Sequence, residues 1–319
     1  MWTWPATCST GRSRSGSALP KAGGRSPAKQ DPFSRRGRAR GSGLFSCRSR
    51  TANYLWLAVR LKNSVVLVTG ASSGIGEATA LAFARKGAQL ALCARRLPRL
   101  QEVAERCREA GSPRVTTKRV DIRDRTQARG FVAAALRDFD RVDVLVNNAG
   151  LGASGRLLDL PEEKARELVE TNILGVVWTT QAALPALIAA RAGVIINVSS
   201  IAGVRAAPYS ALYSATKYAV TGLSHALRGE LSGTGVKVCA VYPAVTATEF
   251  FSVSGGRPLG PVYPARWVAN LIVRTARFPR RDAMVLPFRL AHLAEPILGG
   301  LIDQAIGEAR RRSEPDVTR

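Results

Sequence analysis

A tyrosine, a lysine and a serine stand at a spacing that suits proton transfer to or from an oxygen atom. Tyr213 and Lys217 are four residues apart in a stretch that predicts a helix, so their side chains share one face. A free phenol has a pKa of about 10, and a nearby ammonium group favours the phenolate. Ser200 follows a predicted strand and is placed to hydrogen-bond a substrate oxygen. The three residues predict acid–base chemistry on a carbonyl or hydroxyl group.

A glycine-rich turn lies far upstream, reading Thr69-Gly70-Ala71-Ser72-Ser73-Gly74-Ile75-Gly76. It connects a predicted strand to a predicted helix, which is the context in which such a motif binds a dinucleotide. Its glycines permit unusual backbone angles and close approach, and the amides at the helix start favour phosphate. Asp121 follows the third strand, where its carboxylate suits an adenine amino group or a helix N-cap. The turn predicts a dinucleotide coenzyme.

The end of the second predicted strand indicates which nicotinamide coenzyme is preferred. NAD-specific sites place a carboxylate about twenty residues after the glycines, where it binds the ribose hydroxyls. This chain has Cys93-Ala94-Arg95-Arg96 there, and two guanidinium groups suit a 2′-phosphate. We therefore expect a preference for NADP(H), with NAD(H) as the alternative.

Short apolar runs alternate with helix-like segments from Val65 onward. This alternation predicts an α/β fold in which a doubly wound parallel sheet, the Rossmann arrangement, is covered by helices on both faces. We expect the longest helix to be interrupted near Pro185. Its uncharged stretch 173–190 is at the lower limit of a membrane-spanning length, and we expect it to pack against the core or a partner subunit. Strands are expected at 65–68, 89–93, 115–120, 142–146, 194–198, 236–241 and 283–286, and helices at 74–85, 97–110, 126–137, 162–190, 210–231 and 264–275.

Together these motifs resemble the short-chain dehydrogenase/reductase family over about residues 61–285. The resemblance rests on the glycine turn at 69–76, Asp121, Asn147-Asn148-Ala149-Gly150, Asn172, Ser200, Tyr213 with Lys217, and Tyr242-Pro243. It implies that Tyr213 is the general acid/base, that Lys217 binds the nicotinamide ribose and lowers the tyrosine pKa, that Ser200 orients the carbonyl, and that Asn172 holds a relay water. It also implies a homodimer or homotetramer formed through long central helices.

The resemblance extends the expected coenzyme site along the carboxyl edge of the sheet. One departure is visible, because Pro243-Ala244 stands where the family usually has Pro-Gly; Ala244 fits there if its φ angle is negative. Thr246 can still offer its backbone amide to the carboxamide. The expected coenzyme-binding residues are Gly70, Ser72, Ser73, Gly74, Ile75, Gly76, Arg95, Arg96, Asp121, Ile122, Asn148, Ala149, Gly150, Tyr213, Lys217, Pro243, Thr246 and Thr248.

The two ends of the chain differ from the catalytic domain expected at 59–287. Residues 1–58 are rich in Ser, Gly, Arg and Pro and contain one acidic residue, which predicts disorder. They suit an organellar transit peptide, a basic tail, or an upstream stretch that is not translated if synthesis starts at Val59. Residues 288–319 predict an apolar helix that docks on the domain, covers the substrate pocket or lies on a membrane surface. The expected location is cytoplasmic, or mitochondrial or another organelle if a transit peptide is present.

Composition limits the remaining function classes. The 319 residues carry a formal charge of +24, yet no zinc finger, RNA-binding motif or recognition helix is visible, so we expect no nucleic-acid partner. Five scattered cysteines and two histidines predict neither a metal site nor a disulfide framework. Phe250, Phe251, Val253 and Val262 suggest an apolar substrate pocket. The sequence thus predicts an NADP(H)-dependent oxidoreductase for a small carbonyl or alcohol; the alternative is a catalytically silent NADP(H)-binding sensor or scaffold of the same fold.

Overall fold

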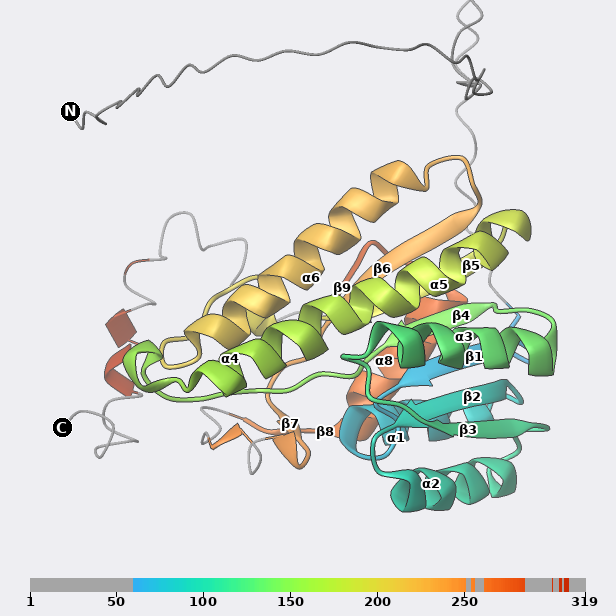
Figure 1. Cartoon of the computed structure of the whole chain (residues 1–319), viewed down its shortest axis with the longest axis horizontal. Coiled ribbons are helices and arrows are strands. Elements are labelled where there is room, and N and C mark those ends of the chain that lie inside the picture. Colours follow the sequence, from blue (N-terminus) through green and yellow to red (C-terminus); the bar gives the residue numbers. More distant parts are fainter. Residues whose placement is uncertain are drawn as a thin grey trace, which may run out of the picture. The chain divides into compact units, whose positions relative to one another are not determined.

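Seven parallel strands form the central sheet, in the order β3-β2-β1-β4-β5-β6-β9 (Figure 1). The computed structural model describes residues 60–250, 254–255, 261–284, 300, 304–305 and 307–309. The expected N-terminal extension and most of the expected C-terminal tail therefore lie outside the described residues. The strands are β1 (Val65–Thr69), β2 (Gln89–Ala94), β3 (Val115–Arg119), β4 (Val144–Asn147), β5 (Gly193–Val198), β6 (Val236–Tyr242) and β9 (Asp282–Met284).

Helices cover both faces of this sheet, which explains why its central strands are apolar throughout. Successive residues of β1 point to opposite faces: Val66 and Val68 belong to one core cluster, and Val65 and Leu67 to the other. The first cluster packs under α1, α2 and α8, and the second under α3, α5 and α6. The helices are α1 (Gly74–Ala84), α2 (Leu97–Glu109), α3 (Arg125–Phe139), α4 (Glu162–Val169), α5 (Gly175–Ala189), α6 (Ala211–Glu230) and α8 (Ala265–Arg277). The doubly wound parallel fold predicted from the sequence is confirmed.

The long helix predicted at 162–190 is broken by a π-helical segment, Glu170–Leu174, that joins α4 to α5. The break expected near Pro185 is wrong, because that proline lies inside α5. The wider turn occurs where Asn172 is fully buried and makes tertiary hydrogen bonds, so the helix deforms for a contact rather than for the proline. Among the described residues, Glu162–Ala189 is the one helical run with the length and apolarity of a membrane span. It packs into the second core cluster through Ala183 and Leu187.

A chain of buried polar side chains connects β4 and β5 to the helices that cover them. The Asn147 amide donates to Thr180 Oγ1 at 2.9 Å and to Asn197 Oδ1 at 2.8 Å. Thr179 donates to Asn147 Oδ1 at 2.7 Å, and the Asn197 amide donates to Ser224 Oγ at 2.9 Å. Because these groups satisfy one another, they can be buried without the cost of unpaired polar atoms. This buried polar chain of hydrogen-bonded side chains fixes α5 and α6 in position on the sheet.

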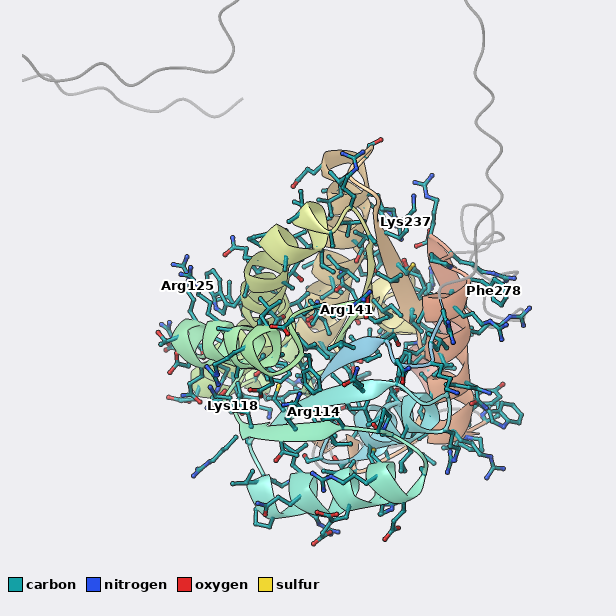
Figure 2. All side chains as sticks on the ribbon, turned by 90° about the vertical axis from the view of Figure 1, so that its right-hand side faces the viewer. Arg114, Lys118, Arg125, Arg141, Lys237 and Phe278 are labelled. Carbon is teal, nitrogen blue, oxygen red and sulfur yellow. The ribbon has the colours of Figure 1, made fainter. Side chains whose placement is uncertain are left out.

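The edge of the sheet opposite the strands' carboxyl ends carries basic side chains, several of which are labelled in Figure 2. Arg114, which precedes β3, lies with its guanidinium carbon 4.8 Å from the Phe139 ring centroid and donates to the Asp138 carbonyl. Arg141, near the start of β4, pairs with Asp143. These arginines are held by local contacts, so this edge is a solvated surface of the domain.

Candidate active site

A cavity of about 470 Å³ opens at the carboxyl ends of the strands. Strand order reverses between β1 and β4, and the carboxyl ends of these two strands contribute Gly70 and Asn148 to the cavity wall. Open α/β sheets bind their ligands at such a switch point. All the expected coenzyme-binding residues except Gly76 line this cavity, as do Ser200, Tyr213 and Lys217.

The glycine turn forms the floor at one end of the cavity. Gly70 has a φ angle of 66°, which side chains rarely adopt, and its missing Cβ would lie 2.8 Å from the Cα of Ala149. Ser73 precedes α1 without capping it by its side chain, which leaves the first amides of the helix available to a phosphate. Gly76 faces Gly70 and does not line the cavity: a Cβ there would lie 2.2 Å from the Gly70 carbonyl oxygen, so this glycine allows the close approach of neighbouring backbone. It allows α1 to pack against the turn.

Tyr213, Lys217 and Ser200 converge at the other end of the cavity. Burial raises the pKa of Tyr213 to about 12, and a hydrogen bond from the Ser200 side chain opposes this increase. Burial also lowers the pKa of Lys217 to about 8, and its Nζ donates to the Val198 carbonyl at 3.1 Å. The Lys217 ammonium nitrogen lies 5.8 Å from the Tyr213 ring centroid. In these surroundings burial of the phenol dominates, so the expected lowering of the Tyr213 pKa by Lys217 stays a prediction for the coenzyme-bound protein.

Asn172 lies beneath the cavity and does not line its wall. Its side-chain oxygen accepts from the Leu151 amide at 2.8 Å, and its amide donates to the Leu151 carbonyl at 2.9 Å and to Thr216 Oγ1 at 2.9 Å. The side chain therefore connects the π-helical segment to the loop after β4 and to α6, the helix that carries Tyr213. Its expected function in holding a relay water stays a prediction.

The two arginines predicted to select the coenzyme both line the cavity, and both are engaged with carboxylates. Arg96 Nη2 lies 2.8 Å from Glu249 and also donates to Ser73 Oγ at 2.8 Å. Arg95 Nη1 lies 3.4 Å from Glu167 on α4. All four side chains are partly exposed, so these ion pairs are of the weak, solvent-screened kind.

Asp121 also lines the cavity, and its carboxylate is bound by the neighbouring Arg123. The guanidinium donates to both carboxylate oxygens, and the Arg123 amide donates to Oδ1 at 3.1 Å. The side-chain hydrogen bonds from Arg123 are the main cause that lowers the pKa of Asp121. Asp121 does not cap the following helix, since Asp124 accepts from the amides of Thr126 and Gln127 there.

An aromatic side chain that the sequence only suggested packs against Tyr213. Phe250 lies 5.3 Å, centroid to centroid, from the Tyr213 ring and fills the space above Gly152, whose missing Cβ would lie 2.3 Å from Phe250 Cζ. Val262, also expected in the pocket wall, is 46% exposed and does not line the cavity. Phe251 and Val253 lie outside the described residues.

The unusual Pro243-Ala244 sequence fits the backbone without strain. Within the described residues, non-glycine residues have positive φ angles at Asn63, Asp140, Arg191 and Tyr209. Ala244 is absent from this set, so its φ angle is negative and its methyl group is tolerated. Residues of the lining that sequence reasoning did not identify include Leu151, Ser154, Thr171, Ile201, Ala207, Ser210 and Glu249.

A family model described as short chain dehydrogenase matches residues 64–255. The chain belongs to the short-chain dehydrogenase family. This short-chain dehydrogenase is 39% identical over 191 residues to an uncharacterized oxidoreductase of Listeria innocua, a match that covers 59% of this chain and 77% of the relative.

Two solved structures show which coenzymes similar folds bind. The short-chain dehydrogenase resembles one from Sphingobium yanoikuyae in complex with NADPH, with 30% identity, a TM-score of 0.67, and coverage of 75% of this chain and 96% of that one. It also resembles a short chain dehydrogenase/reductase from Burkholderia phymatum in complex with NAD, with 26% identity and a TM-score of 0.70. That match covers 76% of this chain and 96% of the other. The short-chain dehydrogenase is therefore an oxidoreductase with a nicotinamide-coenzyme site.

The residues present fit such a coenzyme. The Gly70 turn and the uncapped start of α1 suit its pyrophosphate, and the cavity continues from there to Tyr213 and Lys217. The wall also contains the Asn148-Ala149-Gly150 segment, where a Cβ on Gly150 would lie 3.3 Å from Lys217 Nζ. This glycine leaves room beside the lysine amine for a ribose.

Proposed function

We propose that this short-chain dehydrogenase interconverts a carbonyl and an alcohol on a small apolar substrate with NADP(H), and that Tyr213 is its general acid/base. The observation that supports this most directly is the convergence of three side chains on one cavity: Tyr213 bonded to Ser200, with Lys217 beside it. The same cavity contains the glycine turn, so the acid/base lies in the site that fits the coenzyme.

Each of the three side chains has a distinct task in this proposal. Tyr213 donates its phenolic proton to the carbonyl oxygen during reduction and recovers a proton from the alcohol during oxidation. Ser200 donates a hydrogen bond to the same oxygen as charge develops on it. Lys217 holds positive charge near the phenol, since a group with a pKa of about 8 is mostly protonated at neutral pH. The nicotinamide, when bound, supplies or accepts the hydride.

NADP(H) preference is supported by the end of β2. Arg95 and Arg96 line the cavity there, and neither the strand end nor the following turn contributes a carboxylate for a ribose 2′-hydroxyl. The two solved relatives bind different coenzymes, so the comparison leaves this choice open. Arg95→Asp should lower kcat/KM for NADPH more than for NADH; a wild-type protein with the higher kcat/KM for NADH would contradict the preference.

An apolar substrate is supported by the wall next to Tyr213. Phe250, Leu151 and Ile201 line this part of the cavity, and the Phe250 ring contacts the reactive tyrosine itself. Pockets with this composition favour substrates with an apolar body and one polar group at the reaction centre. We expect reduction as the cellular direction, because cells usually keep NADP(H) reduced.

The decisive experiment measures NADPH oxidation against a panel of aldehydes and ketones, and NADP+ reduction against the matching alcohols. Tyr213→Phe should abolish turnover and leave NADPH binding nearly unchanged. Tyr218→Phe changes an exposed tyrosine on the same helix, so it is the matched control and should retain activity. Full turnover by Tyr213→Phe would overturn the assigned role. A wild-type protein that binds NADPH but reduces nothing in the panel would favour the silent sensor.

The oligomeric state and the cellular location are also proposed here. We expect a homodimer or homotetramer through α5 and α6, and Ile188 on α5 is 40% exposed. Light scattering on the purified protein tests this, and a monomer at micromolar concentration would contradict it. A cytoplasmic or organellar location and membrane contact by the C-terminal tail also stay predictions.

A further inference from the structure

The carboxylate of Glu249 occupies the position where the proposed function needs an anion site. Arg96 Nη2 donates to Glu249 Oε2 at 2.8 Å. The same guanidinium nitrogen donates to Ser73 Oγ at 2.8 Å, and a hydrogen bond joins Ser73 to Glu249 as well. The glycine turn, the end of β2 and the segment after β6 thus meet at one carboxylate. Arg96 is also one of the two arginines expected to bind the 2′-phosphate of NADP(H), and Ser73 of the glycine turn lies beside it.

The chain on both sides of Glu249 is positioned by close contacts. Thr248 lies against the glycine turn, because a Cβ on Gly74 would be 3.0 Å from the Thr248 Cγ2 atom. Phe250 packs on Gly152 and on the Tyr213 ring. Just before this segment, β7 (Thr246–Ala247) pairs with β8 (Tyr263–Pro264). Glu249 therefore reaches Arg96 from a backbone that is fixed by its neighbours.

We propose that Glu249 is an intramolecular competitor for the 2′-phosphate of NADP(H), and that it sets how strongly the enzyme discriminates between NADP(H) and NAD(H). This inference rests on the proposed use of NADP(H). A carboxylate and a phosphate cannot both take the hydrogen bonds of one guanidinium edge, and the two anions repel each other. NAD(H) has a hydroxyl in place of the phosphate and does not need to displace Glu249.

The size of the effect follows from the exposure of the ion pair. The Arg96 and Glu249 side chains are each 50% exposed, and pairs of this kind contribute little because solvent screens them. Removal of the carboxylate charge should therefore strengthen NADPH binding by about two- to fivefold. It should change NADH binding by less than about 1.5-fold, because NADH binding does not displace Glu249 from its ion pair with Arg96.

The test measures the Kd of NADPH and of NADH by isothermal titration with the full chain. The variants are Glu249→Gln, Arg96→Ala, the double variant, and Glu105→Gln as the matched control. Glu105 forms an exposed ion pair with Arg108 at 2.6 Å on α2 and does not line the cavity. We expect Glu249→Gln to bind NADPH more tightly and NADH equally well. In the Arg96→Ala background the same change should strengthen NADPH binding less, because the shared partner is gone and only the repulsion between the two anions remains.

Three results with the Glu249→Gln variants would overturn the inference. Unchanged or weaker NADPH binding by Glu249→Gln would show that the carboxylate does not compete. Weaker NADH binding would show that Glu249 instead holds the ribose hydroxyls. Equal strengthening in the Arg96→Ala background would assign the effect to general charge. A wild-type protein that binds neither coenzyme would refute the proposed function together with this inference, whereas normal binding with an inert Glu249→Gln would refute the inference alone.

Discussion

The rings of Phe250 and Tyr213 lie 5.3 Å apart, centroid to centroid, with their planes inclined by 57°. This contact places an apolar group of the segment after β6 directly on the proposed acid/base. It contributes to the burial that raises the pKa of Tyr213 to about 12. The environment of the reactive phenol is thus set partly by the substrate side of the cavity.

Phe250→Ala should lower the pKa of Tyr213 towards the ordinary value of about 10, because water then reaches the phenolate. The measurement is an alkaline titration of tyrosinate absorbance without coenzyme, with the curve of the matching Tyr213→Phe variant subtracted. Phe278→Ala removes a 40% exposed ring beyond the end of α8 and serves as the control. An unchanged titration in Phe250→Ala would mean that the ring does not shield the phenol.

Ser200→Ala should move the same titration in the opposite direction, because the hydrogen bond from Ser200 lowers the pKa of Tyr213. It should also reduce kcat by about 100-fold, the usual effect of losing one donor to a developing oxyanion. Ser200→Thr keeps a hydroxyl group and should retain more activity than Ser200→Ala. Wild-type rates in Ser200→Ala would contradict the proposed role of Ser200 as a hydrogen-bond donor to the substrate oxygen.

Lys217→Met should stabilise the protein most at neutral pH. Burial lowers the pKa of Lys217 from its ordinary 10.5 to about 8, so below pH 8 the buried charge lowers the free energy of unfolding. That cost decreases as the pH rises from about 8 to 10.5, because the unfolded chain then binds more protons than the folded one. At pH 7 the loss of the buried charge should raise the free energy of unfolding by at most about 3 kcal/mol. The loss of the hydrogen bond made by Lys217 should reduce this gain by about 1 kcal/mol.

Urea unfolding of Lys217→Met and wild type at pH 7 and pH 9.5 checks this prediction. Lys118→Met is the control, since Lys118 is exposed on β3 and donates to the Gly130 carbonyl at 3.0 Å. The stabilising difference should shrink at the higher pH for Lys217→Met alone. A difference that grows with pH would contradict the assigned burial of the charged amine.

Gly76→Ala should destabilise the fold and weaken coenzyme binding. The new methyl would lie 2.2 Å from the Gly70 carbonyl oxygen and 2.5 Å from Asn148 Nδ2, so the turn must shift. Overpacking of this kind costs about 1–3 kcal/mol. Gly222→Ala on α6 has open space around it and should be neutral or stabilising by up to about 1 kcal/mol. Thermal unfolding compares the two variants, and equal melting temperatures would contradict the argument.

The sequence predicted those parts of the fold and site that depend on local patterns. Apolar runs between helix-like segments predicted the parallel sheet, and the four-residue spacing of Tyr213 and Lys217 predicted their shared face. The pairing of Asp121 with Arg123 is also local, because the two residues are only two positions apart. Both charges are visible in the sequence, and their spacing alone does not show that they pair.

The remaining features depend on contacts between distant segments. Glu249 and Arg96 are 153 residues apart, and no periodicity indicates that they meet. The π-helical segment forms where Asn172 binds the backbone of Leu151, 21 residues earlier, so helix propensity alone places the break wrongly at Pro185. Such features follow from packing, which a single sequence does not display.

The buried polar chain of Thr179, Thr180, Asn147, Asn197 and Ser224 has a consequence for divergence within the family. Replacing Thr179 or Ser224 with an apolar residue would leave Asn147 Oδ1 or the Asn197 amide buried without this partner, at a cost of about 1–3 kcal/mol. Neutral drift at these five positions is therefore expected to proceed by paired or triple replacements. Homologues that lose Asn147 should carry compensating changes at Asn197 or Thr179, a coevolution signal that reflects architecture rather than substrate choice.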